Sequence, residues 1–472
     1  MQERYEHFIG GAFVPAGSGR HLETTNPATG KPLAEIARGD ASDVDAAVKA
    51  AESALPGWRD RRPIERGRVL TEIARRLRER QQEIAALEVL EAGKPAWQAP
   101  FEVEIAAQYF EFYGGLVNAL GGETIDLGAG YHSYTRREPF GVVGIILPWN
   151  APINQAARAA APALAAGNVV VAKPSEFTSA SLLELAQLAV ECGLPAGALN
   201  VVTGTGPEAG AAIVAHGGVR KVAFTGSLRA GREVAHLAAD RILPLTLELG
   251  GKSPNLVFAD ADLEQAAQSA PLAVFGNAGQ DCCARSRILV ERPALDHFME
   301  LFEKAVTALR VGDPLDEQTE MGPLISADQR ATVASYADDG APVAFRGSAP
   351  DGPGYWFPPT VLCPVSNDDR AAREEIFGPV AAVIPFDDEA EAVRIANDTI
   401  YGLSGSIWTR DGAKALRVAR GVQTGVLSIN SNTSVRVSTP FGGFKQSGYG
   451  RELGPHALDA YTEIKSIYYS TT

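Results

Sequence analysis

Two adjacent cysteines are the residues of this 472-residue chain whose type and setting best suit covalent chemistry. Cys282 and Cys283 follow Gly276 and Gly279, and the apolar run 288–290 comes just after them. A thiol on a bend that leads into a buried strand can present its sulfur and its own backbone N–H to a cleft. This arrangement suits a nucleophile that attacks a carbonyl carbon beside a donor for the oxyanion. The alternative is a pair of buried structural cysteines, the commoner role of two arbitrary cysteines.

Seven short motifs, one of which contains Cys282, follow one another along the chain. They are Pro-Trp-Asn at 148–150, Lys-Pro-Ser-Glu at 173–176, Phe-Thr-Gly-Ser at 224–227, Leu-Glu-Leu-Gly-Gly-Lys-Ser-Pro at 247–254, Gly-Gln-Asp-Cys at 279–282, Glu-Glu-Ile-Phe-Gly-Pro-Val at 374–380 and Pro-Phe-Gly-Gly-Phe-Lys-Gln-Ser-Gly at 440–448. In these motifs and their order the chain resembles the aldehyde dehydrogenase superfamily along nearly its whole length. The resemblance points to the NAD(P)-dependent, non-acylating branch that releases its product by hydrolysis.

The resemblance assigns the chemistry to three residues. Cys282, rather than Cys283, falls on the family's nucleophile position, and as a thiolate it would attack an aldehyde to give a thiohemiacetal. The Asn150 side chain and the Cys282 N–H would hold the oxyanion. Loss of hydride would leave a thioester, and Glu248 matches the family's base for its hydrolysis. Because Glu248 lies on an apolar strand before two glycines, we expect its pKa to be raised.

The resemblance also implies NAD as cofactor, with NADP as a weaker alternative. Lys173 would bond the adenosine ribose, and Glu176 would accept from the 2′-hydroxyl and repel a 2′-phosphate. Glu375 matches the residue that holds the nicotinamide ribose, and Phe377 the ring beside the nicotinamide. The full expected set is Trp149, Lys173, Ser175, Glu176, Gly206, Gly226, Ser227, Leu249, Glu375 and Phe377. No metal site is expected.

The middle of the chain alternates apolar strands with helices. Strands are expected at 142–147, 168–172, 199–202, 221–224 and 244–249, and a second alternating region begins after residue 251. This spacing predicts an open parallel sheet with helices on both faces and nucleotide bound at the carboxyl ends of its strands. Gly226 and Ser227 follow a strand and open a helix, which makes them a better phosphate turn than the near-fingerprint at 204–210.

We therefore expect an α/β protein in three parts. A Rossmann-like, parallel-sheet NAD-binding domain would comprise residues 1–120 and 141–250, and a second α/β catalytic domain residues 251–449. Residues 121–140 and 450–472 would form a small β oligomerisation arm, because in the resembled family these segments pair and build the subunit contact of a homodimer or homotetramer. The alternative for 131–137 is a surface hairpin without a partner. One long amphipathic helix is expected over 63–92.

Charge and cysteine content limit the partners. With 43 basic and 57 acidic residues the formal net charge is −14, which disfavours nucleic acid or an anionic membrane as a partner and leaves a small-molecule aldehyde. Four cysteines, two of them adjacent, make no disulfide framework, so a reducing compartment is expected. Neither a secretory signal nor an apolar run of about 20 residues is visible, and the expected location is cytoplasmic.

Three other functional classes fit the sequence less well. A Cys-His hydrolase needs a positioned imidazole, yet none of the seven histidines falls within the motifs. A CoA-acylating dehydrogenase uses a thiol in place of water, and that branch generally lacks the equivalent of Glu248. A member without activity, kept as a binding or structural protein, is disfavoured by the intact set of Asn150, Glu248 and Cys282.

The expected substrate is a polar or carboxylate-bearing aldehyde, such as a semialdehyde. If Asn150 starts a helix, Asn154 and Arg158 follow on one face beside Gln155, where many family members have large apolar residues. Arg436, before the motif at 440–448, would supply a second guanidinium. An aromatic or other aldehyde is the alternative, and a structural salt bridge of Arg158 fits the pattern equally well.

The C-terminal tail departs from the family at one position. Several members place a second acid where this chain has Pro455. A proton relay through that position is therefore not expected, and Glu248 would act alone or through water and backbone.

Overall fold

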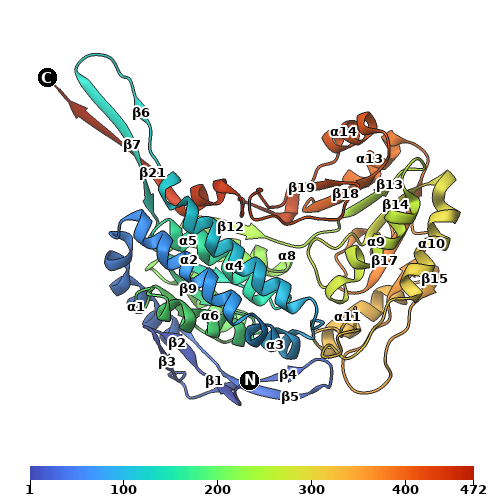
Figure 1. Ribbon diagram of the computed structural model, residues 1–472, viewed down its shortest axis with the longest axis horizontal. Helices are drawn as coiled ribbons and strands as arrows, with labels where there is room; N and C mark the ends of the chain where they lie inside the picture. Colours follow the sequence, from blue (N-terminus) through green and yellow to red (C-terminus); the bar gives the residue numbers. More distant parts are fainter. Residues whose placement is uncertain (472) are drawn as a thin grey trace.

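Two large, mainly parallel sheets form the framework of the protein, one in each of the two lobes in Figure 1. The structure is a computed structural model and describes residues 1–471. The first sheet has eight strands in the order β20-β12-β11-β8-β9-β10-β2-β3, and the second has seven in the order β15-β16-β17-β14-β13-β18-β19. The predicted α/β class with a parallel sheet is confirmed.

The first sheet owes its buried centre to β-branched residues, which suit a pleated surface covered on both faces. β8, for example, reads Val-Val-Gly-Ile-Ile, and all five residues are buried. The strands are β2 (His7–Ile9), β3 (Ala12–Val14), β8 (Val142–Ile146), β9 (Val169–Lys173), β10 (Leu199–Val201), β11 (Val219–Thr225), β12 (Leu245–Glu248) and β20 (Gly448–Tyr449). The helices that pack around this sheet are α1 (Ala41–Arg59), α2 (Pro63–Glu79), α3 (Gln81–Ala92), α4 (Ala99–Leu116), α5 (Pro152–Ala165), α6 (Ala180–Glu191), α7 (Ala211–Ala215) and α8 (Leu228–Ala239).

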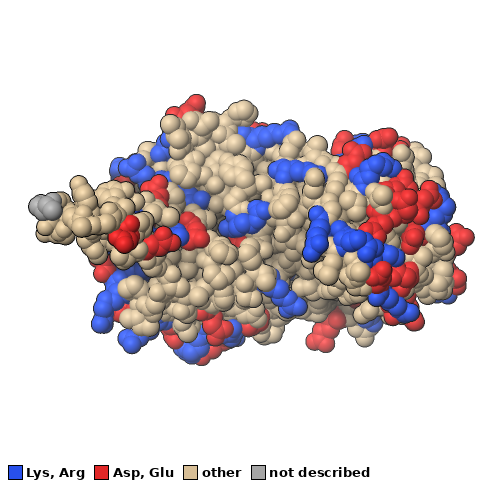
Figure 2. Space-filling view, turned by 90° about the horizontal axis from the view of Figure 1, so that it is seen from above, with Lys and Arg blue, Asp and Glu red and all other residues tan. Residues whose placement is uncertain are grey.

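The second sheet is built in the same way and has its own hydrophobic core. Its strands are β13 (Pro254–Val257), β14 (Arg287–Glu291), β15 (Val343–Arg346), β16 (Thr360–Leu362), β17 (Val380–Phe386), β18 (Ser404–Trp408) and β19 (Val426–Ile429). Its helices are α9 (Leu263–Phe275), α10 (Leu295–Thr307), α11 (Ala327–Ala337), α12 (Arg370–Arg373), α13 (Glu389–Asn397) and α14 (Gly412–Gly421). Figure 2 shows acidic residues gathered at the end of this lobe, away from the projecting ribbon.

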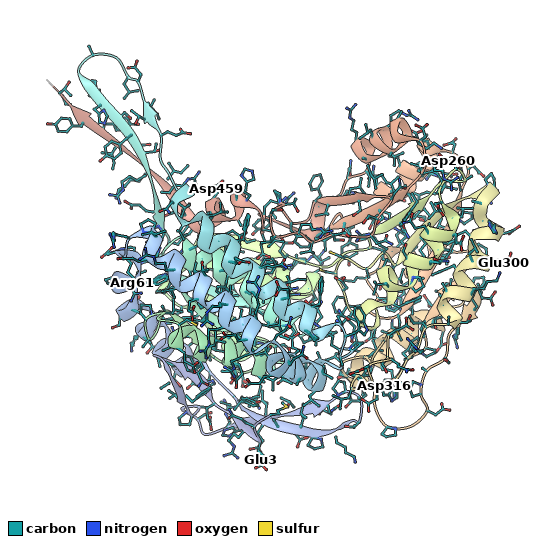
Figure 3. The ribbon with its side chains drawn as sticks, in the orientation of Figure 1. Glu3, Arg61, Asp260, Glu300, Asp316 and Asp459 are labelled. Carbon is teal, nitrogen blue, oxygen red and sulfur yellow. The ribbon has the colours of Figure 1, made fainter. Side chains whose placement is uncertain are left out.

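A β ribbon projects from the first lobe (Figure 1). β21 (Thr462–Ser470) pairs antiparallel with β7 (Tyr131–Pro139), which also pairs with β6 (Thr124–Ile125). An ion pair between Arg137 and Asp459, 2.8 Å apart, lies at the base of the ribbon, where Figure 3 labels Asp459. The pairing of the two segments is as expected from the sequence.

The helix predicted over 63–92 is in fact two helices, so that prediction was wrong in one detail. α2 ends before Arg80, whose φ of −99° and ψ of 16° leave the helical region. The Arg80 guanidinium lies 2.8 Å from Glu184 of α6, a contact that fixes the bend. Because both segments keep an apolar face, the hydrophobic pattern does not reveal the break.

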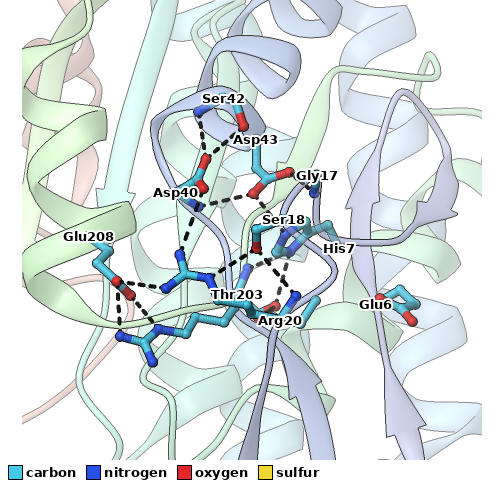
Figure 4. Close-up of polar contacts among 12 residues, drawn as sticks. Glu6, His7, Gly17, Ser18, Arg20, Asp40, Ser42, Asp43, Thr203 and Glu208 are labelled. Carbon is cyan, nitrogen blue, oxygen red and sulfur yellow. Dashed lines mark hydrogen bonds and ion pairs between the residues drawn. The ribbon is translucent and has the colours of Figure 1, made fainter.

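The N-terminal segment is tied to the first sheet by a partly buried polar network (Figure 4). The backbone N–H of Thr203 donates to Nδ1 of His7 at 3.2 Å, and Asp43 lies 3.6 Å from Nε2 of the same ring. Glu208 accepts two hydrogen bonds from Arg38, at 2.8 and 2.9 Å. The network supports the turn after β10, to which Gly206 belongs. A small sheet of β1 (Arg4–Tyr5), β4 (His21–Asn26) and β5 (Lys31–Ala37) completes this region.

Among the described residues 1–471, no helix has the length and apolar character needed to cross a membrane.

Candidate active site

A cavity of about 270 Å³ lies at the carboxyl ends of β8, β11 and β12 and is closed by residues of the second lobe. Its lining is Pro148, Trp149, Asn150, Gln155, Thr225, Gly226, Ser227, Glu248, Leu249, Gly250, Cys282, Gln329, Thr332, Glu375, Ile376 and Phe377. The structure therefore brings together all three residues predicted to carry the chemistry, Cys282, Glu248 and Asn150.

The loop before Cys282 holds an uncommon backbone. Asn277 and Ala278 have φ of 52° and 56°, in the left-handed region that costs non-glycine residues about 1–3 kcal/mol each. Gln280 is fully buried and holds the bend, because its side chain donates to Asn277 O at 3.0 Å and accepts from Ile325 N at 2.9 Å. At Gly279, a Cβ would lie 2.2 Å from Gly378 O. A single permitted loop shape thus fixes where the thiol stands.

The surroundings of the Cys282 thiol favour its protonated form. A hydrogen bond with Cys283, followed by burial, raises the pKa of Cys282 well above its usual value. Cys283 itself is buried, and its backbone N–H donates to Asp281 at 2.9 Å. The possible metal-ligand atoms of Asp281, Cys282 and Cys283 lie within 4.8 Å of one another. A nucleophile of this kind needs a base or a bound substrate to favour the thiolate.

Asn150 is oriented from both sides. Its Nδ2 donates to Gln280 O at 3.0 Å, and its Oδ1 accepts from Gln155 Nε2 at 3.1 Å. Asn277 Nδ2 donates to the Asn150 carbonyl at 3.0 Å. Since an amide nitrogen carries two protons, one N–H of Asn150 remains free to donate. A donor fixed in this way needs no reorganisation when charge develops on a substrate oxygen.

Glu248 is the unpaired carboxylate of the site. It ends β12 and is 2% exposed, and neither of its oxygens has a hydrogen-bond partner. Burial, reinforced by repulsion from Glu452, raises its pKa well above the usual value, although Arg158 acts in the opposite direction. Once ionised, a carboxylate with a raised pKa takes a proton from water more readily than an exposed one does.

The residues predicted to bind the substrate are mostly engaged elsewhere, and Arg158 and Asn154 do not line the cavity. Arg158 is buried, 2.5 Å from Glu452, and lies over the Phe441 ring at 5.1 Å. Asn154 donates to Glu102 at 2.6 Å. Arg436 is exposed, and neither it nor the other two lines the cavity. Of the predicted set only Gln155 reaches the cavity, where it binds Asn150.

Glu452 is the main residue that the sequence analysis missed. It is 2% exposed and faces Arg158 and Glu248, whereas Pro455 is exposed and starts a short 3₁₀ helix. The C-terminal segment thus brings an acid close enough to act on Glu248, three residues before Pro455. An acid between Arg451 and the buried Leu453 was the available signal. Thr225 and Gln329 of the cavity lining were also not foreseen.

The predicted cofactor residues form two groups. Trp149 and Phe377 meet edge to face at 5.3 Å in the cavity, and Glu375 accepts from Gly251 N at 3.1 Å. Burial raises the pKa of Glu375 to about 7, although the Gly251 N–H and Lys252 act against it. Gly226, Ser227 and Leu249 line the same cavity.

The second group lies outside the cavity lining, on the segments after β9 and β10. Lys173 is buried, and its Nζ lies 3.5 Å from Glu176. Ser175 is buried as well, and Gly206 begins the turn after Thr205. These positions follow the carboxyl ends of neighbouring parallel strands, where open α/β sheets bind their ligands.

A thiol, a fixed amide and an unpaired carboxylate line one cleft of this α/β protein. The profile of the Aldehyde dehydrogenase family matches residues 13–467. The chain belongs to the aldehyde dehydrogenase family and is an enzyme of that family.

Relatives agree over the full length of the chain. A betaine aldehyde dehydrogenase of Mesorhizobium japonicum is 42% identical over 480 residues, which cover 100% of this chain and 98% of that protein. The structure of an NAD-dependent aldehyde dehydrogenase from Sinorhizobium meliloti has a TM-score of 0.97 at 39% identity and covers 100% of this chain and 95% of its own. The NAD+ complex of an aldehyde dehydrogenase from Bacillus cereus has a TM-score of 0.97 at 41% identity, with 100% and 97% covered.

Proposed function

We propose that the protein oxidises an aldehyde to a carboxylic acid with NAD, through a thiohemiacetal and a thioester on Cys282 that is hydrolysed with Glu248 as base. The observation that carries the proposal is the presence of Cys282, Asn150 and Glu248 in the lining of one cavity. The family resemblance and the NAD-dependent relatives support the same reaction.

Both the backbone and the side chains of the cleft suit the binding of a dinucleotide. Gly226 precedes α8, whose Ser227 cap accepts from Ala230 N at 3.2 Å and leaves other first-turn N–H groups for a phosphate. At Gly250 a Cβ would lie 2.0 Å from the Glu375 carboxylate and would displace it from its present position. Lys173 and Glu176 would hold the adenosine ribose. Bound NAD supplies the chemistry of accepting a hydride.

The side chains then divide the reaction between them. The Cys282 thiolate attacks the aldehyde carbon, and the free N–H of Asn150 with the Cys282 backbone N–H stabilises the oxyanion. After oxidation a thioester remains on Cys282. Glu248 removes a proton from a water molecule, the resulting hydroxide attacks the thioester carbon, and the acid leaves as the thiolate is restored.

The proposal is tested by replacing each thiol separately. Cys282→Ala is expected to abolish NADH formation from an aldehyde, because no covalent intermediate can form. Cys283→Ala should retain most of the activity, since this side chain is buried and does not line the cavity. Equal loss in both variants, with both folded, would remove Cys282 as the sole nucleophile.

NAD is proposed over NADP on the strength of Glu176, whose carboxylate would accept from the 2′-hydroxyl and repel a 2′-phosphate. The comparison to make is the affinity of the unmodified enzyme for the two nucleotides. Tighter binding of NADP would contradict this assignment.

For the substrate we propose an uncharged aldehyde, aliphatic or aromatic, in place of a semialdehyde. The guanidinium that would have held a carboxylate, that of Arg158, is already neutralised by Glu452 at 2.5 Å. A second carboxylate at that position would face the charges of Glu452 and Glu248 together.

The ribbon of β6, β7 and β21 is proposed as the contact between subunits of a homodimer or homotetramer. Its exposed apolar side chains are Ile125, Tyr131, Ile464, Tyr468 and Tyr469, and a monomer rarely leaves such a group uncovered. Sedimentation of the protein before and after deletion of residues 462–472 measures the assembly directly.

A further inference from the structure

Three buried charges lie behind the active site, and nothing in the proposed reaction uses them. Glu88 on α3, Lys94 after it and Glu102 on α4 are 0%, 0% and 9% exposed. Lys94 Nζ is 3.3 Å from Glu88 and 3.3 Å from Glu102. None of them lines the cavity. Removing three charges from water is costly, and their mutual attraction offsets that cost only when the geometry and further hydrogen bonds are good.

Burial and the charge of Glu102 raise the pKa of Glu88, although Lys94 acts against them. Burial lowers the pKa of Lys94, but the charges of Glu102 and Glu88 outweigh it and raise the pKa above its usual value. Lys94 is therefore a cation that holds two acids from different helices at one point. Such an arrangement fixes the position of whatever the acids touch next.

Both acids touch the first turn of α5. Glu88 accepts from the backbone N–H of Ile153 at 2.8 Å, and Glu102 accepts from Asn154 Nδ2 at 2.6 Å. α5 has no side-chain cap of its own at Ala151. Glu88 thus satisfies a first-turn donor from another helix, and its charge favours the positive end of the α5 dipole.

The first turn of α5 in turn sets Asn150. That residue lies just before the helix, and Gln155, inside it, donates to Asn150 Oδ1 at 3.1 Å. A shift of α5 would move this support, while the other contact of the amide, Gln280 O, belongs to the separate Cys282 loop. The free N–H of Asn150 points correctly only if α5 and the loop keep their relative positions.

We propose that Glu88, Lys94 and Glu102 form a positioning triad for Asn150, acting through the first turn of α5. The triad touches neither substrate nor cofactor, and it sets the direction in which the amide donates to the oxyanion. This inference rests on the proposed function, because it assumes that Asn150 stabilises that oxyanion. Misplacement of a reacting group by about 1 Å can cost about 100-fold in rate, so a partial shift of the amide should be readily measurable.

The experiment uses Glu88→Gln in the full-length enzyme. A glutamine has the same shape, but it can offer its oxygen to Ile153 only by turning its NH₂ toward Lys94, so one contact is lost in either orientation. The single-turnover rate of NADH formation, at saturating NAD and aldehyde, is expected to fall on the order of tenfold. The Kd for NAD should not change.

A matched control lies one turn further along α3. Glu91 is equally buried and accepts from Ala180 N at 3.1 Å, which caps α6 instead of α5. Glu91→Gln should leave the single-turnover rate within about twofold of the unmodified enzyme, well inside the scatter expected of individual contacts. An equal loss in Glu91→Gln would indicate general softening of the core and overturn the proposal.

A double-mutant cycle with Asn150→Ala separates positioning from ordinary stability. If Glu88 acts through Asn150, adding Glu88→Gln to Asn150→Ala costs no further rate. If Glu88→Gln costs the same factor in both backgrounds, or nothing in either, the triad does not position the amide. An Asn150→Ala enzyme with the original rate would instead overturn the proposed role of Asn150 in the reaction. That outcome differs from one in which only the positioning role of Glu88 fails.

Asn154→Ala covers the case in which Glu88→Gln does not fold. It removes only the Glu102 contact and keeps all three charges of the triad. A smaller loss of single-turnover rate is expected, again absent in the Asn150→Ala background. A folded Asn154→Ala enzyme with an unchanged rate would overturn the proposal in that case.

Discussion

Two buried clusters, each with two carboxylates and one cation, contact helix α5, and they differ in how completely the carboxylates are paired. In the positioning triad, Lys94 lies 3.3 Å from both acids, and each acid also accepts a hydrogen bond from α5. The second cluster, here called the base triad, consists of Glu248, Arg158 and Glu452. Arg158 contacts Glu452 at 2.5 Å, while Glu248 has no hydrogen-bond partner on either oxygen.

The two clusters have nearly the same residue types, but this difference in pairing suits the positioning triad to a structural role and the base triad to a reactive one. Buried polar atoms are nearly always hydrogen-bonded, so an unpaired buried carboxylate needs an explanation. In the positioning triad every carboxylate oxygen is used, and the result is rigidity. In the base triad Glu248 is left without a hydrogen bond, and burial raises its pKa, as often happens at functional sites.

The largest loss of turnover is expected when Glu248 of the base triad is replaced. Glu248→Gln should lower steady-state turnover by roughly 10²–10⁴-fold, because a general base is removed from the hydrolytic step. Stopped-flow measurement should still detect a full burst of NADH followed by a stalled steady state. Glu88→Gln is the internal contrast, since it should slow the burst itself. Unchanged steady-state turnover in Glu248→Gln would remove this carboxylate as the base.

In the positioning triad the sensitive member is the cation. Lys94→Met leaves two buried acids without their partner and should lower the free energy of unfolding by about 3–5 kcal/mol. Urea denaturation at neutral pH measures the change. Lys49→Met is the control, because Lys49 pairs with Asp45 on an exposed helix face and should matter little. A Lys94→Met protein as stable as the original would show that the triad is loosely held.

The pairing within the base triad is tested through pH. Burial raises the pKa of Glu248 first, repulsion from Glu452 adds to it, and Arg158 opposes both. Glu452→Gln removes the repulsion and frees Arg158 to attract Glu248, so both changes lower the pKa. A base with a lower pKa ionises at lower pH, and the rising limb of kcat should move to lower pH. An unmoved limb would mean that Glu452 does not act on Glu248.

Much of this molecule could be predicted from local sequence. The strands β8 and β11 are short apolar runs, and the residues that follow them line the cleft because parallel strands end at one edge. Cys282, Asn150 and Glu248 belong to motifs of consecutive residues, so their convergence could be foreseen from the resemblance alone.

The sequence was least informative for residues whose partners are far away in the chain. Asn154 and Arg158 belong to α5, which begins at Pro152 after Asn150 and not at Asn150 itself, and their bonds go to Glu102 and Glu452. Periodicity tells which way a side chain points, and not whether a distant acid has already neutralised it. The positioning triad was missed for the same reason, since its members look like charges on solvated helices.

The smallest expected effect concerns the membership of Arg158 in the base triad. If the Arg158 guanidinium is paired with Glu452, replacing it with a cation of another shape should not alter the preference between charged and uncharged aldehydes. The measurement that checks this is kcat/KM for succinic semialdehyde and for butyraldehyde, which differ mainly at the carboxylate. Butyraldehyde should be the better substrate, and the ratio should stay within about twofold in Arg158→Lys, which keeps the buried charge but loses the planar fork that binds a carboxylate through two bonds. If the enzyme prefers succinic semialdehyde and this preference is lost in Arg158→Lys, then Arg158 binds the substrate carboxylate. Arg158 would then not be neutralised by Glu452, as the base triad requires.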